Sequence, residues 1–299
     1  MNSLLVEKYR PTNLSDYIGS TEVISCAEQF ITDGDIPHLL LYGKAGTGKT
    51  TLAKLLVKNI SCDYLYVNAS DENSVDSIRF KIKTFISAVG FNDLKVVILD
   101  EADYLTPNAQ AALRNLMETF SKHSRFIMTC NYVERIIDPI QSRCQLFSVT
   151  IPNKADAARK VVTILQNEKV QFDINDVKII IDNGYPDMRR IINNVQKSIQ
   201  NNKLVLDNAS ILNADFKQDI LNCIVDRKDV KHIRQIIADN SVRDFSEVFT
   251  YLYENVDEIS KDNADIILMV LAQYQYQDAL VVDKEINFAA MISAMKEKL

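Results

Sequence analysis

The sequence predicts an α/β domain built on a parallel sheet, followed by two all-helical domains. Up to about residue 150, short apolar runs alternate with segments whose apolar residues recur at helical spacing, as in a parallel sheet covered on both faces. A cluster of glycines joins the first of these runs to a helical segment. Past residue 152, apolar residues recur at intervals of three and four, and no convincing strand appears. We therefore expect a sheet domain at residues 1–150, a small helical domain at 151–212 and a second helical domain at 213–299.

The composition is that of a soluble globular protein. The chain has 299 residues, 47% of them hydrophobic and 25% charged, which is enough to build large cores. The longest apolar run, Ile266–Ala272, is too short to span a membrane, and the N-terminus becomes polar by its seventh residue. We expect neither a membrane span nor a signal peptide, and hence a soluble intracellular protein without a membrane partner.

The cysteines, histidines and net charge argue against several classes of site. The five cysteines contain no Cys-x-x-Cys pair and are odd in number, and the three histidines are scattered. This pattern indicates a reducing compartment and no structural zinc. The net charge of −6 disfavours a simple nucleic-acid-binding protein, because such proteins are usually basic. Any DNA contact would then need a local basic stripe or several subunits acting together.

Four short apolar runs are typical of buried strands. Strands of a parallel sheet are covered on both faces, so they are apolar throughout rather than at every second residue. Each run is followed by a segment with helical spacing, which predicts successive strand–helix–strand units. The runs are His38–Tyr42, Tyr64–Val67, Val96–Leu99 and Phe126–Thr129.

The glycine cluster matches a phosphate-binding motif. Three of the seven glycines lie between positions 43 and 48, where the sequence fits G-x-x-x-x-G-K-[ST] between an apolar run and a helical segment. In such a loop the backbone N–H groups and the N-terminus of the next helix hold phosphate oxygens. A plain strand-to-helix turn is the alternative, which the flanking elements disfavour. Lys49 would contact the β- and γ-phosphates, and Thr50 would bind Mg²⁺. The predicted nucleotide contacts of this loop are Gly43, Lys44, Ala45, Gly46, Thr47, Gly48, Lys49, Thr50 and Thr51.

Polar side chains follow the third and fourth apolar runs. Asp100 and Glu101 come directly after Leu99, at the sheet edge where ligands of open α/β sheets bind. Asp100 would hold Mg²⁺, directly or through water, and Glu101 would orient and deprotonate the attacking water. Alone, these acids fit a solvated helix cap equally well; together with the phosphate loop they indicate ATP hydrolysis. Asn131 comes directly after Phe126–Cys130, where its amide would position water near the γ-phosphate, although alone it fits a turn residue.

Five short motifs point to one protein family. They are Glu7–Pro11, the phosphate loop, Asn68–Asp71, Asp100–Asp103 and Ser142–Cys144. Together they resemble the AAA+ sliding-clamp loader ATPase subunits, which include the small subunits of replication factor C and the large subunit of the loader in T-even-type phages. The resemblance is clearest over residues 5–150 and extends more weakly to about residue 195. The rest of the chain resembles the family only in being helical and of similar length. The Ser-Arg-Cys triplet is its specific mark, since phosphate loops occur in many families.

The resemblance implies further site residues. Arg143 would be an arginine finger that reaches the γ-phosphate bound by a neighbouring subunit, where such a residue contributes roughly 10³- to 10⁵-fold in rate. Asn131 corresponds to the first sensor of the family. Arg189 is the expected second sensor in a helical lid, with Arg190 as the alternative, because the family's Gly-Asp-Met-Arg segment carries two extra residues here. The segment expected near the adenine is Tyr9, Arg10 and Pro11.

The resemblance also implies what the assembled protein does. The three parts would be an ATPase domain, a lid and a collar that oligomerises the chain. The protein would be a DNA-stimulated ATPase, using ATP and Mg²⁺, in a ring with copies of itself and a distinct subunit. That ring would open a sliding clamp and load it onto primer–template DNA in the cytoplasm or nucleus, or in the host cytoplasm if a phage encodes it. Two alternatives remain open: another AAA+ DNA motor, such as a branch-migration helicase subunit, and a scaffold subunit without turnover.

A basic stripe is the candidate DNA contact. Arg79 and Lys83 are four residues apart and share one side of a predicted helix, and Gln110 and Arg114 share one side of the next. From the residues alone, the stripe fits an ordinary solvated face better. In the family, the corresponding helices line the inner channel of the ring, which implies contacts of these four residues with the DNA backbone. Such contacts would be independent of base sequence and would weaken with salt.

Overall fold

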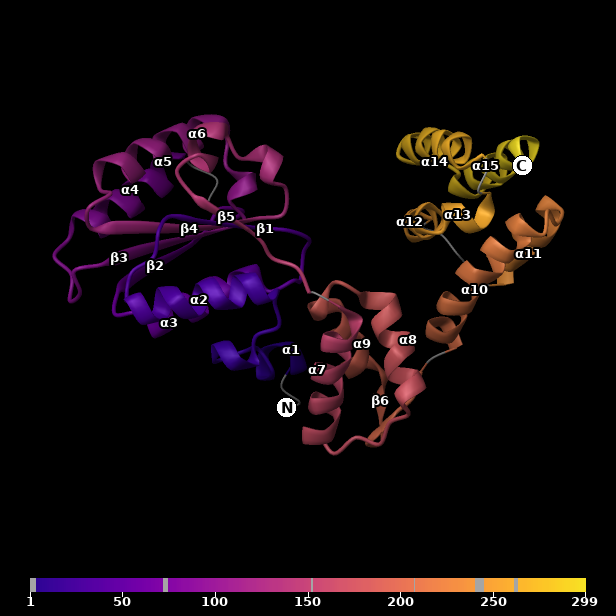
Figure 1. The fold of residues 1–299 in the computed structure, drawn as a ribbon, viewed down its shortest axis with the longest axis horizontal. Coiled ribbons are helices and arrows are strands. Elements are labelled where there is room, and N and C mark those ends of the chain that lie inside the picture. The colour runs from indigo at the N-terminus through magenta and orange to yellow at the C-terminus, as the bar shows by residue number, and fades with distance from the viewer. Residues whose placement is uncertain (1–3, 72–74, 152, 207, 240–244, 261–262) are drawn as a thin grey trace. The chain divides into compact units, whose positions relative to one another are not determined.

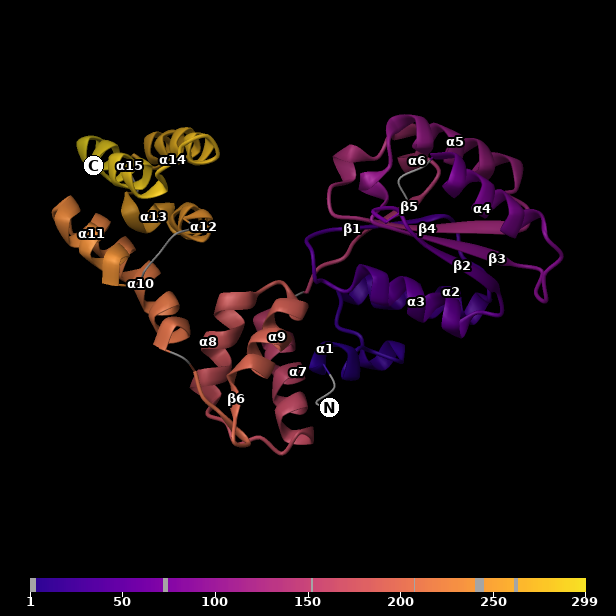
Figure 2. The same ribbon diagram turned by 180° about the vertical axis from the view of Figure 1, so that it is seen from behind.

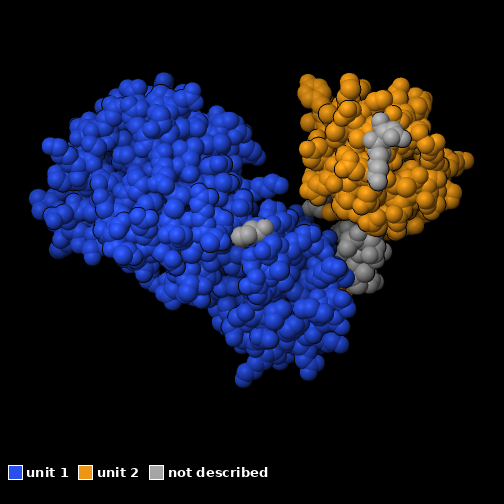
Figure 3. Space-filling model, in the orientation of Figure 1, with its two compact units in different colours: residues 1–204 blue, residues 205–299 orange. Residues whose placement is uncertain are grey.

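The computed structural model describes residues 4–71, 75–151, 153–206, 208–239, 245–260 and 263–299. The chain forms two compact units, Met1–Leu204 and Val205–Leu299 (Figure 3). The sheet and the helices that immediately follow it both belong to the first unit.

The first unit ends with a short hairpin, and not after residue 212 as the sequence suggested. The hairpin joins β6 (Ile199–Gln200) to β7 (Lys203–Leu204), and the backbone of β7 hydrogen-bonds that of Gln171 in the same unit. Helix α10 (Asn208–Val225) then runs through residue 212 without a break. The two strands are too short to interrupt the helical spacing of the sequence, which is why the prediction contained no strand here.

Five parallel strands form the sheet of the first unit, in the order β2-β3-β4-β1-β5 (Figure 1). Four of them occupy the predicted apolar runs, and β5 is an additional strand at one edge. Because all five run parallel, their carboxyl ends meet at one edge of the sheet. The predicted α/β class is confirmed. The strands are β1 (Leu39–Tyr42), β2 (Asp63–Asn68), β3 (Lys95–Asp100), β4 (Ser124–Cys130) and β5 (Gln145–Ser148).

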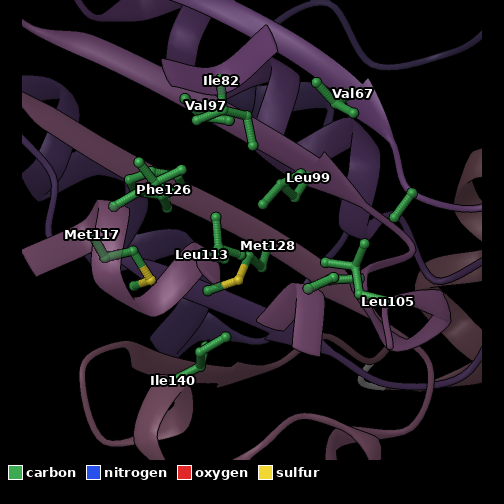
Figure 4. Close-up of a cluster of buried hydrophobic side chains, with 14 of the residues drawn as sticks. Val67, Ile82, Val97, Leu99, Leu105, Leu113, Met117, Phe126, Met128 and Ile140 are labelled. Carbon is green, nitrogen blue, oxygen red and sulfur yellow. The ribbon is translucent and has the colours of Figure 1, made fainter. Parts of the chain in front are cut away.

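Helices cover both faces of the sheet (Figures 1 and 2). Alternate residues of β3 enter opposite cores, because successive side chains of a strand point to opposite faces. Val97 and Leu99 pack in the core beneath α4, α5 and α6, which Figure 4 shows, whereas Val96 and Ile98 pack in the core beneath α2 and α3. These helices are α2 (Thr21–Asp33), α3 (Lys49–Asn59), α4 (Val75–Ser87), α5 (Pro107–Thr119) and α6 (Asp138–Gln141).

Three further helices, which we call the lid, complete the first unit. The apolar stripes of its helices bury Val161, Ile180 and Ile191. The short N-terminal helix α1 (Leu5–Lys8) packs against the third of these helices, so the N-terminal segment belongs structurally to the lid. The lid helices are α7 (Lys154–Asn167), α8 (Ile174–Gly184) and α9 (Met188–Ser198). Elsewhere in the described part of the first unit, 3₁₀ turns lie at Leu14–Asp16, Ala102–Tyr104 and Val133–Arg135.

The second unit is all-helical in its described residues. Its core is centred on Phe288, whose ring stacks on Phe245 at a centroid distance of 4.6 Å and meets Phe249 edge to face at 5.8 Å. No helix in the described part of the chain is long and apolar enough to cross a membrane. After α10, its helices are α11 (Val230–Asp239), α12 (Ser246–Glu254), α13 (Val256–Ile259), α14 (Ala264–Asp278) and α15 (Lys284–Lys298).

Candidate active site

The phosphate loop connects β1 to α3 and depends on glycine for its shape. Gly43 has a φ of 140°, and a Cβ there would lie 2.6 Å from the carbonyl oxygen of Val149. Gly46 has a φ of 72°, and a Cβ there would lie 1.7 Å from a carboxylate oxygen of Asp187 in the lid. Positive φ values are accessible to glycine at little cost, so these residues permit both the turn and the close approach of the lid.

The lid contacts the loop directly. Asp187 caps the N-terminus of α9, because its carboxylate accepts a hydrogen bond from the backbone N–H of Arg190 at 2.9 Å. The next residue, Met188, donates its backbone N–H to the carbonyl of Gly46 at 3.2 Å. The first turn of α9 therefore lies against the loop.

Lys49 and Asn131 lie together at the carboxyl edge of the sheet. The ammonium of Lys49 donates to the side-chain oxygen of Asn131 and to the carbonyls of Gly43 and Lys44, each at 2.8 Å. Burial lowers the pKa of Lys49, while Asp103 and Asp100 act in the opposite direction. The loop lysine and the residue predicted as the first sensor are thus hydrogen-bonded although 82 positions separate them.

Three hydroxyl groups surround the carboxylate of Asp100. One oxygen accepts from Thr50 at 2.6 Å and from Thr129 at 2.5 Å, and the other accepts from Tyr66 at 2.7 Å. Burial and the neighbouring Asp100 carboxylate raise the pKa of Tyr66, so the phenol is the donor. The sequence prediction included Thr50 but missed the other two. A threonine within the otherwise apolar fourth run was the available signal for Thr129.

The oxygens of Thr50 and Asp100 fit a magnesium ion. They are hard ligands and lie next to each other, as a shared octahedral site requires. The described residues contain no group of three His, Cys, Asp or Glu side chains that could hold a metal. In proteins, Mg²⁺ is usually held by one or two protein groups together with water and phosphate oxygens.

Glu101 has a strained backbone. Its φ is 58°, in the left-handed region that non-glycine residues seldom adopt. Its backbone N–H donates to the hydroxyl of Thr129 at 3.0 Å, which fixes this conformation. Such strain is typical of residues whose position matters for function.

Asp103 fixes the end of β4 and was not predicted as a site residue. It is buried, and one of its oxygens accepts from the backbone N–H groups of Asn131 and Tyr132 at 3.1 and 3.2 Å. Asp103 is the second aspartate of the Asp-Glu-Ala-Asp motif, so the segment that carries Glu101 also orients Asn131.

Lys49, Thr50, Asp100, Glu101 and Asn131 line a cleft of about 370 Å³ within the first unit. Its walls come from the phosphate loop, the ends of β3 and β4, the N-terminal segment and the lid. Arg189 lines it, whereas Arg190 is not among its lining residues. The predicted adenine-side residues Tyr9, Arg10 and Pro11 also line it.

Tyr9 joins the N-terminal segment to the lid. Its hydroxyl donates to the carboxylate of Glu168 at 2.5 Å, and Lys8 forms an ion pair with the same carboxylate at 2.6 Å. Burial and Glu168 raise the pKa of Tyr9 to about 12. Its ring is therefore held at the cleft wall by a lid residue.

Arg143 does not line this cleft. It follows α6, and its guanidinium lies on the surface, paired with Glu118 of α5 and donating to the carbonyl of Pro139. A group placed in this way can meet a ligand of another molecule but contributes nothing to the cleft of its own chain.

The residues of the basic stripe differ in their exposure. Arg79 and Lys83 are exposed on α4, and Arg114 is half-buried on α5. The predicted DNA contact of Gln110 does not agree with the structure. Its side chain is buried, donates to the carbonyls of Leu105 and Arg135, and accepts from the backbone N–H of Ile137. Its amide is therefore fully engaged inside the domain and cannot contact DNA.

Comparison with known proteins gives one consistent result. Residues 39–151 match the model of the ATPase family associated with various cellular activities (AAA). The replication factor C small subunit of Natronomonas pharaonis is 34% identical over 268 residues, which cover 88% of this chain and 79% of that protein. The replication factor C small subunit 1 of Pyrobaculum aerophilum is 32% identical over 310 residues, which cover 97% of this chain and 93% of that protein.

Other matches are shorter or more distant. The replication factor C small subunit of Sulfolobus acidocaldarius is 40% identical over 211 residues, or 68% of this chain, and the match spans only 65% of that relative's length. Among solved structures, the RuvB Holliday junction branch migration motor of Thermotoga maritima matches with a TM-score of 0.59 at 16% identity, covering 84% of this chain and 91% of that one. That likeness is one of fold alone.

Proposed function

The chain belongs to the replication factor C small subunits, within the AAA ATPases, and from this premise we propose that it is an ATP-hydrolysing subunit of a clamp loader. The observation that carries the proposal is the cleft in which Lys49, Asn131 and the Thr50–Asp100 pair lie together. Such a loader opens a sliding clamp and closes it around primer–template DNA.

ATP would occupy the cleft with its phosphates on the loop. The backbone of residues 43–48 and the N-terminus of α3 would hold the phosphate oxygens. Lys49 would exchange its bonds to loop carbonyls for bonds to the β- and γ-phosphates. The adenine would lie against Tyr9–Pro11, and Arg189 would contact the phosphates from the lid. A Mg²⁺ ion held by Thr50 and Asp100 would neutralise charge on the phosphate oxygens.

Hydrolysis would use the residues around Glu101. Its carboxylate would accept a proton from the attacking water, while the amide of Asn131 orients that water. The water oxygen forms a bond to the γ-phosphorus, and the bond from this phosphorus to the β–γ bridging oxygen breaks, leaving ADP and phosphate. The strained backbone of Glu101 and the bond from its N–H to Thr129 support this role, because together they hold the backbone at the cleft in one conformation.

Arg143 would complete the site of a neighbouring subunit. Its surface position, outside the cleft of its own chain, supports a role in trans. Charge develops on the transferred phosphoryl group during the reaction, and a guanidinium from the neighbour would stabilise it. Turnover would then depend on the assembled ring, formed with copies of this chain and a distinct subunit through the second unit.

DNA would be held by Arg79, Lys83 and Arg114 through its phosphates. The exposed position of the first two supports this, whereas Gln110 is withdrawn from the set. Contacts of this kind bind without reading the bases, and several subunits together would offset the negative charge of one chain. DNA bound in this way would align the ATP sites and stimulate hydrolysis.

The two alternatives are less well supported. A branch-migration helicase subunit shares the fold at 16% identity, whereas the relatives at 32–34% identity over 88–97% of the chain are replication factor C small subunits. A scaffold subunit without turnover would have no use for the arrangement of Lys49, Asp100, Glu101 and Asn131.

An ATPase assay tests the proposal. The purified chain is assayed alone, with its candidate partner subunit, and with sliding clamp and primed DNA added separately and together. A loader gives its highest turnover only when clamp and primed DNA are both present. Stimulation by DNA alone, coupled to strand separation, would indicate a helicase. An absence of turnover in every mixture would indicate a scaffold subunit that does not hydrolyse ATP.

A further inference from the structure

The third hydroxyl at Asp100 comes from a residue outside every motif of the site. Tyr66 lies on β2, an edge strand of the sheet, opposite Ile98 of β3. Asp100 is two residues beyond Ile98, so its side chain is on the same face as that of Tyr66. The phenol reaches along this face and donates to the oxygen of Asp100 that Thr50 and Thr129 leave unoccupied.

The ring of Tyr66 is held independently of its hydroxyl. The ammonium of Lys54 lies 4.4 Å from the ring centroid, within the range of a cation–π contact. The ring also packs against the core beneath α2 and α3. Removing the oxygen alone would therefore leave the ring in place and delete only the bond to Asp100.

The arrangement assigns a role to this hydroxyl. We infer that Tyr66 is a positioning residue for the magnesium site, holding the Asp100 carboxylate so that its other oxygen is directed at Thr50. A carboxylate bonded at one oxygen only can rotate, whereas donors on both oxygens fix its plane. Outer partners of metal ligands commonly contribute 10- to 100-fold to metal affinity. The inference rests on the proposed function, because it assumes that the cleft binds a magnesium–nucleotide complex.

The decisive variant is Tyr66→Phe, with Tyr64→Phe as its control. Tyr64 lies on the same strand with its side chain exposed, so both changes remove one phenol oxygen from β2. Affinity for ADP is measured by calorimetry on the full chain, first with a chelator and then across a magnesium titration. We expect Tyr66→Phe to bind ADP as tightly as the parent when magnesium is absent. It should need about tenfold more Mg²⁺ to reach the increase in ADP affinity that magnesium gives the parent. Tyr64→Phe should match the parent in both measurements.

The other outcomes are distinct. An unchanged magnesium requirement in Tyr66→Phe would show that the hydroxyl does not position the carboxylate. An equal loss of ADP affinity with and without magnesium would show that Tyr66 contacts the nucleotide itself, since it also lines the cleft. If the parent chain binds no ADP under any condition, the proposed function fails, and this inference fails with it.

Discussion

The guanidinium of Arg143 lies 2.5 Å from the carboxylate of Glu118, which is also 3.9 Å from the guanidinium of Arg114. One carboxylate of α5 thus links the proposed arginine finger to a proposed DNA contact. The pair is substantially exposed to solvent, and exposed ion pairs contribute only about 0–1 kcal/mol. Arg143 is therefore held in a defined direction at little cost and can exchange Glu118 for another anion.

Arg143→Ala should leave ATP binding of the chain unchanged and lower turnover of the assembled ring by on the order of 10³-fold or more. Binding is measured by nucleotide titration, and turnover by phosphate release in the presence of clamp and primed DNA. Arg159→Ala, which removes an exposed arginine of the lid, is the matched control. Full turnover in rings in which every interface lacks Arg143 would exclude the role in trans.

Lys49→Ala should abolish useful ATP binding. Charge-assisted hydrogen bonds contribute about 1.5–3 kcal/mol each, so loss of the ammonium should raise the dissociation constant on the order of 10²-fold or more. Lys58→Ala removes an exposed lysine from the same helix and should bind ATP like the parent. Calorimetry distinguishes the two, and normal clamp loading by Lys49→Ala would refute the proposed site.

Gln110→Ala should destabilise the first unit. The change removes three hydrogen bonds and leaves the backbone groups of Leu105, Arg135 and Ile137 unpaired, at a cost of about 1–3 kcal/mol. Urea unfolding measures this loss. Asn108→Ala, at an exposed position of the same helix, should change stability by less than about 0.5 kcal/mol. Equal stability of the two variants would contradict the structural role of Gln110.

The stability of the first unit should fall as pH decreases through the range below pH 6.5. Burial and the nearby Arg125 guanidinium lower the pKa of His38 to about 4, from an ordinary value of 6.5. Its neutral ring accepts a hydrogen bond from the backbone N–H of Phe126. Between these two values the unfolded chain binds a proton that the folded chain does not. The contribution of His38 to the free energy of unfolding is therefore fully present above pH 6.5. It declines toward pH 4, by on the order of 1–2 kcal/mol after solvent screening.

Urea unfolding across this range, compared with His38→Gln, measures the effect. The variant should lose this part of the pH dependence, because glutamine does not titrate, while the carboxylates contribute equally in both chains. A pH dependence identical to that of the parent would show that another group is responsible.

Local patterns predicted β1–β4 and the phosphate loop, because the apolar runs and the glycine spacing are contained within short stretches of sequence. The sequence did not predict β5 (Gln145–Ser148), whose residues are mostly exposed and whose run is less apolar. A strand of this kind exists because β1 offers it an edge, and such pairing depends on residues far away in the chain.

The site shows the same division. The motif residues Lys49, Thr50, Asp100 and Asn131 were predicted, because each stands at the end of a recognisable element. Tyr66 and Thr129 were missed, since their importance comes from neighbouring strands that bring their hydroxyls to one carboxylate. Gln110 was misassigned for a related reason. Helical spacing placed it beside Arg114, but the segment after β4 covers it and engages its amide.

The contact between Gly46 and Asp187 has a mechanical consequence. With no room for even a methyl group between them, any side chain at position 46 would displace the carboxylate of Asp187, which caps the N-terminus of α9. A Cβ at position 46 would therefore disturb both the loop and the cap of α9, which also meet through the hydrogen bond from Met188 to Gly46. Glycine at this position thus preserves the contact between the loop and α9 as well as the turn of the loop itself.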